Sequence, residues 1–175
     1  MHIQVKLGAL RMKNKPPLDL NGTGFCASFN FRRTARAVTK LFDAALQETG
    51  LRSTQFAILV GIAKNQPISI GALGDLLVID GTTLARSLRI LEKEGLVSIS
   101  ERAAMRQRFL AITGKGERTL ARSLPAWRVA QERFVATMGS EHWLELRSEL
   151  ERIAQAAVAM EKPDKEASAV LPATD

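Results

Sequence analysis

The spacing of apolar residues changes its period once along this chain. Leu84, Leu88 and Leu91 recur at steps of four and three, which is the spacing of one helix face. From residue 97 to residue 112, apolar and polar residues alternate in two runs separated by a short charged stretch, which is typical of two half-buried strands. The sequence therefore predicts a helix followed by a two-stranded hairpin within an otherwise helical chain.

Helical spacing predicts three helices before that unit. The first begins at Ser28 and closes at Gly50. We expect Ser53 to cap the second, which ends before Pro67, and Ser69 to cap a short third helix. A tight turn then joins the third helix to the helix of the three leucines.

Two further helices are expected after the hairpin. Thr113 caps a long helix to about Met138, interrupted at Pro125, and the last helix ends at Pro163. Helix, turn, helix and hairpin follow one another in the order of a winged helix-turn-helix. The predicted fold is therefore mainly α, a winged helix-turn-helix domain with a small β-hairpin wing, flanked by N- and C-terminal helices.

Composition excludes several classes of protein. The 175 residues include one Cys, so no internal disulfide forms, and two His, so a Cys/His zinc site lacks ligands unless carboxylates or a second chain supply them. Neither a long uncharged apolar run nor a secretory signal is present, and we expect a cytoplasmic protein. No phosphate-binding glycine loop or nucleophile motif occurs, which predicts neither an enzyme nor a cofactor or metal site.

Positive charge is concentrated in two segments. The formal net charge is +7, residues 1–40 carry eight Lys/Arg against one acid, and residues 82–108 carry six against three. Clustered cations favour a polyanionic partner because each phosphate contact releases counterions. A solvated basic surface is the alternative.

The helix of the three leucines has the composition of a DNA-reading helix. With the leucines inward, polar and basic residues face a major groove, where Arg forks pair with guanine and hydroxyls bond phosphate at the helix start. These candidate residues are Thr82, Thr83, Arg86, Arg89 and Lys93. Arg102 and Arg106 flank the hairpin tip and are candidates for the adjacent minor groove.

Residues 25–160 resemble MarR-type (multiple antibiotic resistance) regulators. The carrying residues are Gly50-Leu51 with Gln55-Phe56, Leu84-Ala85-Arg86, the run from Leu91 to Val97, and the run from Leu110 to Gly116. The resemblance implies a homodimer that binds a pseudo-palindromic DNA operator, a repressor released by a small, often phenolic, effector. It also implies a dimerisation region (25–50 and 114–160) and a DNA-binding domain (51–113). The composition of the two ends, which have no sustained helical period, predicts flexible tails at 1–24 and 161–175.

One departure from the family pattern lies in the wing. The family usually has Asp-x-Arg there, and Arg106 fits the Arg while Ala104 replaces the Asp. A winged-helix module that binds protein, with weak DNA binding, is therefore an alternative. Met12 is a second candidate start of the chain.

Two hypotheses concern regulation. Arg32, Arg33 and Arg36 at the start of the first helix are candidates to hold an effector carboxylate. Cys26 lies just before that helix, where one branch of the family has a peroxide-sensing Cys, so a redox-sensing regulator is the other. That branch pairs its Cys with Tyr residues, and this chain has no Tyr.

Overall fold

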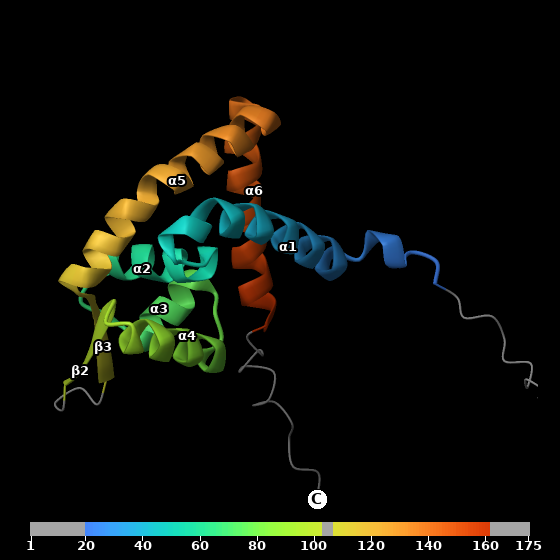
Figure 1. Ribbon diagram of the computed structural model, residues 1–175. Helices are drawn as coiled ribbons and strands as arrows, with labels where there is room; N and C mark the ends of the chain where they lie inside the picture. Colours follow the sequence, from blue (N-terminus) through green and yellow to red (C-terminus); the bar gives the residue numbers. More distant parts are fainter. Residues whose placement is uncertain (1–19, 103–106, 162–175) are drawn as a thin grey trace, which may run out of the picture. The chain divides into compact units, whose positions relative to one another are not determined.

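The computed structural model describes residues 20–102 and 107–161 (Figure 1). The chain divides into two compact units, residues 1–38 and 39–175, and the boundary falls inside the first α-helix. The elements are, in order, η1 (Thr23–Phe25), α1 (Ala27–Leu46), η2 (Gln47–Thr49), α2 (Ser53–Asn65), β1 (Ile68–Ser69), α3 (Ile70–Leu77), α4 (Gly81–Lys93), β2 (Val97–Arg102), β3 (Gln107–Ile112), α5 (Gly114–Met138) and α6 (Ser140–Glu161).

Short polar side chains begin three of these helices. The Ser69 hydroxyl accepts a hydrogen bond from the Ala72 N–H at the start of α3, at 3.1 Å. The Thr113 hydroxyl accepts one from the Gly116 N–H at the start of α5, at 3.0 Å. Both caps were predicted from the sequence, because hydroxyls satisfy amides that the first turn leaves without a partner. Asp80 caps α4 in the same way.

The three strands form one antiparallel sheet in the order β1-β3-β2. In the hairpin Val97 pairs with Ile112 and Ile99 with Leu110, so the alternating apolar residues face the same side. The Gln66 side chain accepts a hydrogen bond from the Ile112 N–H at 2.9 Å and ties the end of α2 to β3. The predicted hairpin is confirmed, and β1 adds an edge strand that two residues were too few to reveal.

Residues of the sheet and of helices α2, α3 and α4 form one apolar core. It includes Leu59 of α2, Leu73 of α3 and Leu110 of β3, all fully buried, together with the three leucines of α4. These contacts fix the order helix, turn, helix and hairpin into a winged helix-turn-helix. The predicted fold class is therefore confirmed.

The last two helices are much less covered than the winged helix-turn-helix. In Figure 1, α5 begins beside the hairpin and α6 begins at the far end of α5. Phe134 of α5 and Trp143 of α6 pack edge to face, with ring centroids 5.4 Å apart. No residue of α6 is buried.

Two sequence expectations are wrong. Ser53 does not cap α2 but is its first residue, and Arg52 occupies the cap position. Pro125 does not interrupt α5, which continues from Gly114 to Met138 with the proline inside it. A proline removes one backbone donor, but packing holds the helix together around it: Trp127, two residues later, stacks on Phe56 of α2.

Candidate nucleic-acid interface

Helix α4 is fixed to the core by one face. Leu84, Leu88 and Leu91 are at most 1% exposed. At the N-terminus, the Asp80 carboxylate accepts a hydrogen bond from the Thr83 N–H at 2.9 Å. The Thr83 side chain and backbone, as hydrogen-bond donors, hold the pKa of Asp80 below its ordinary value. The helix therefore has a fixed start and a fixed rotation about its axis.

The opposite face of α4 is polar, basic and accessible. All five residues predicted to face DNA are exposed: Thr82, Thr83, Arg86, Arg89 and Lys93. Thr82, Arg86 and Lys93 lie on one stripe because they follow at steps of four and seven. The ion pairs within residues 20–102 and 107–161 are Arg52–Asp43 and Arg152–Glu149, so neither neutralises this face.

Sequence reasoning missed two other exposed residues, one in this helix and one in the hairpin. Ile90 of α4 is 45% exposed and lies beside the stripe of Arg86 and Lys93. Arg108 of β3 is exposed in the hairpin, opposite Glu101 of β2. The exposure of Ile90 could have been predicted from its position two residues after Leu88, which places it away from the side of the buried leucines.

Only part of the predicted wing lies within the described residues. Arg102 is the last residue of β2, and its backbone pairs with Gln107 of β3. Arg106 and Ala104 lie outside the described residues. The expectation that Arg102 and Arg106 reach a minor groove therefore stays a prediction.

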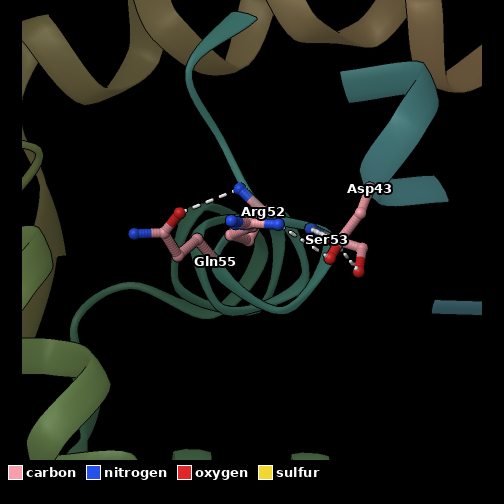
Figure 2. A network of polar contacts seen from close by, with 4 residues as sticks. All are labelled: Asp43, Arg52, Ser53 and Gln55. Atoms are coloured by element: carbon pink, nitrogen blue, oxygen red, sulfur yellow. Dashed lines mark hydrogen bonds and ion pairs between the residues drawn. The ribbon is translucent and has the colours of Figure 1, made fainter. Parts of the chain in front are cut away.

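A polar network joins the C-terminal half of α1 to the start of α2 (Figure 2). The Asp43 carboxylate accepts hydrogen bonds from the backbone N–H and the hydroxyl of Ser53, both at 2.7 Å. Arg52 forms an ion pair with Asp43 at 3.5 Å, and its backbone N–H donates to the Gln55 side chain at 2.8 Å. The Ser53 N–H, above all, holds the pKa of Asp43 below its ordinary value, against a smaller opposing effect of burial.

An apolar groove lies close to this network. It has a volume of about 490 Å³ and is lined by the following side chains and backbone: Phe42, Leu46, Ser53, Phe56, Ala57, Val60, Gly61, Lys64, Asn65, Leu76, Leu77 and Trp127. Lys64 is the one ionisable residue in this lining. Arg32, Arg33 and Arg36, the predicted effector ligands, are exposed on α1 and do not line the groove.

Cys26 is exposed between η1 and α1. Its backbone N–H donates to the Thr23 carbonyl at 3.1 Å. Among the described residues, no group of three or more His, Cys, Asp or Glu side chains could hold a metal ion. No helix in the described ranges has the length and apolar character needed to cross a membrane.

Comparisons with known proteins agree with this geometry. The sequence model of the MarR family matches residues 51–111. The transcriptional regulator HosA of Escherichia coli is 34% identical over 92 residues, which are 52% of this chain and 68% of HosA.

Solved structures give the same result over a longer part of the chain. The Mycobacterium tuberculosis transcriptional regulator MosR, crystallised in complex with DNA, is 32% identical, with a TM-score of 0.71 over 78% of this chain and 98% of MosR. PcaV of Streptomyces coelicolor, a transcriptional regulator solved with its natural ligand, shares the fold at 20% identity, with a TM-score of 0.70 over 80% of this chain and 99% of PcaV. These relatives are transcriptional regulators and not enzymes.

Proposed function

The chain belongs to the MarR family of DNA-binding transcriptional regulators, and from this we propose that it is a homodimeric repressor released from its operator by a small apolar anion. The observation that supports DNA binding is the exposed basic face of α4, which lies opposite the three buried leucines of the same helix. A regulator of this kind acts on the chromosome, and the proposal includes a cytoplasmic location.

In the proposed complex, the exposed face of α4 reads the major groove. Arg86 and Arg89 each offer a bidentate fork to the O6 and N7 atoms of guanine. Thr82 and Thr83 bond phosphate at the helix start, and Lys93 adds a phosphate contact further along. Arg102 and Arg106 contact the adjacent minor groove from the wing.

Exposed apolar residues on the terminal helices support a dimer. Helix α6 buries no residue although it carries large apolar side chains, of which these are exposed: Leu144, Leu150, Ile153 and Met160. Exposed apolar side chains along one helix favour a partner surface, because folded monomers rarely leave a large apolar patch in water. We assign 25–50 and 114–160 to dimerisation and 51–113 to DNA binding, with tails at 1–24 and 161–175.

Two-fold symmetry would then determine the form of the operator. A symmetric dimer presents two copies of α4 to half-sites about one helical turn apart, roughly 34 Å, or a multiple of that distance. A ligand that favours another spacing of the two helices lowers the affinity for DNA.

The apolar groove supports the choice of effector. Its aromatic and aliphatic lining suits a flat apolar molecule, and Lys64 suits an anionic substituent such as a carboxylate. The earlier candidates Arg32, Arg33 and Arg36 are a rival anion site, and oxidation of Cys26 is a rival signal. Both remain hypotheses.

Fluorescence anisotropy tests the proposal. The purified protein is titrated into labelled DNA from upstream of its own gene and into an unrelated duplex, at several salt concentrations. We expect selective binding whose affinity falls steeply with salt, because phosphate contacts release counterions. Only weak and unselective binding would overturn the proposed reading of DNA and favour the protein-binding module.

A further inference from the structure

One large apolar side chain of α4 lies on the side of the helix that is exposed to solvent. Leu84, Leu88 and Leu91 are at most 1% exposed, whereas Ile90 is 45% exposed. Ile90 follows Leu88 by two residues, which turns it by about 200° around the helix axis from that leucine. It therefore adds little to the core and is available to a partner of the helix.

The neighbours of Ile90 on the helix surface belong to the candidate DNA interface. Arg86 precedes it by four residues and Lys93 follows it by three, so both side chains lie next to it. Both cations are exposed, and neither takes part in the ion pairs found within residues 20–102 and 107–161. Basic surroundings favour a polyanion, and not an apolar protein surface, as the partner that covers Ile90.

The preceding turn of the helix offers little polar competition beside Ile90. Ser87 lies three residues before it and is partly buried. The Ser87 hydroxyl donates to the Thr83 carbonyl of the same helix at 3.1 Å, so its proton is already used. The surface between Arg86 and Lys93 on this side of α4 is therefore formed mainly by the methyl groups of Ile90.

The chemistry of Ile90 limits what it can recognise on DNA. Its side chain has no hydrogen-bond donor or acceptor, so it cannot pair with the polar atoms of a base edge. The apolar group that the major groove presents is the C5 methyl group of thymine, which apolar side chains contact. Because Ile is branched at Cβ, its χ1 angle in a helix is nearly fixed, and such a contact costs little side-chain entropy.

We propose that Ile90 is a specificity-determining residue that packs on the C5 methyl group of one thymine in each half-site of the operator. The inference rests on the proposed function, in which α4 lies in the major groove, and adds an apolar contact to its polar ones. One helical turn separates Ile90 from Arg86, a rise of about 6 Å. Since base pairs follow one another every 3.4 Å or about that distance, the thymine should lie within about two base pairs of the guanine that Arg86 contacts.

Removing one methyl group from the DNA tests the contact. A duplex selected from a random library with the wild-type protein is resynthesised with each thymine replaced in turn by deoxyuridine, which lacks the C5 methyl group. At one thymine per half-site, we expect the replacement to lower the affinity of the wild-type protein about fourfold, which corresponds to one buried methyl group. Ile90→Ala should bind the thymine and uracil duplexes equally, with the affinity that the wild type has for the uracil duplex.

A control variant and a restored methyl group complete the test. Glu92→Ala changes an exposed residue two positions beyond Ile90, on the opposite side of the helix, and should keep the wild-type ratio of the two affinities. Cytosine at the identified thymine position should weaken binding by the wild type, and 5-methylcytosine there should recover about fourfold. Ile90→Ala should not distinguish 5-methylcytosine from cytosine.

Failure of the thymine contact is distinguishable from failure of the proposed function. A wild-type protein that prefers the selected duplex, but whose affinity no single uracil changes, overturns the contact and leaves the proposed function intact. A uracil effect that persists in Ile90→Ala arises from the shape of the duplex and also overturns the contact. A selection that yields no preferred duplex overturns the proposed reading of DNA, and the role of Ile90 with it.

Discussion

The Asp43 carboxylate of α1 accepts two hydrogen bonds from Ser53, one from its backbone N–H and one from its hydroxyl, each at 2.7 Å (Figure 2). Arg52 occupies the cap position of α2, and its side chain carries only donors, so that side chain cannot accept a hydrogen bond from the first turn. Asp43 supplies that acceptor from ten residues earlier. The start of the DNA-binding domain is therefore held by a side chain of the helix assigned to dimerisation.

Removing the Asp43 carboxylate should destabilise the protein. Asp43→Ala leaves the Ser53 N–H without its acceptor, and we expect a loss of about 1–2 kcal/mol in the free energy of unfolding, as for other lost caps. Urea denaturation at one protein concentration measures it. Glu132→Ala, at an exposed position of α5, is the control and should stay within about 0.5 kcal/mol of wild type. Equal losses in the two variants would contradict the capping role.

The pH dependence of that loss follows from the lowered pKa of Asp43. Because the pKa in the folded protein lies below the ordinary value of 3.8, the carboxylate stabilises the fold fully above that value. The contribution is lost as the pH falls through the folded pKa. The difference in unfolding free energy between wild type and Asp43→Asn should therefore be constant from about pH 7 to pH 5 and shrink below about pH 4. A difference in unfolding free energy that grows as the pH falls would contradict this prediction.

Gly116 marks a close approach of α5 to the hairpin. A Cβ at this position would overlap the Leu96 carbonyl oxygen and lie 2.7 Å from the Ile112 side chain. Gly116→Ala should therefore cost about 3 kcal/mol, because backbone must move. Gly114→Ala is the matched control: the new Cβ meets only the end of the Arg118 side chain, at 3.4 Å. We expect that control to be neutral or slightly stabilising in thermal denaturation, and similar losses in both variants would contradict the packing.

Lys64 should give the apolar groove its preference for anions. In a Trp143→Phe background, Trp127 is the only tryptophan, and it lines the groove. Its fluorescence should be quenched by 4-nitrobenzoate at concentrations about tenfold lower than by neutral 4-nitrobenzamide. Lys64→Gln should remove that preference and retain the binding of the amide. If Arg32→Gln/Arg33→Gln/Arg36→Gln removes it instead, the anion site lies on α1.

The sequence predicted those features that depend on neighbouring residues. The order of elements, the Ser69 and Thr113 caps and the inward leucines of α4 follow from local spacing, and the structure agrees. Thr82 and Arg86 were placed on the exposed face for the same reason, because the inward leucines leave only one outward side.

Features that depend on distant residues could not be predicted. Ser53 reads as a cap from its own sequence, but the acceptor at this helix start belongs to Asp43 in another helix. Pro125 reads as a break, but α5 is held by contacts such as Trp127 on Phe56. Lys64 gave no signal, because a lysine at the end of a helix is ordinary until the surrounding groove is known.

The most direct test of the account is the specificity of an Arg86→Ala variant. A duplex is selected from a random library with the wild-type protein, and its affinity is compared with that of an unselected duplex at one salt concentration. We predict that Arg86→Ala lowers the affinity for the selected duplex by about 10- to 100-fold and the affinity for the unselected one much less. Arg128→Ala, on the exposed surface of α5, should keep the wild-type ratio. An Arg86→Ala protein that retains that ratio would contradict the claim that α4 reads the operator.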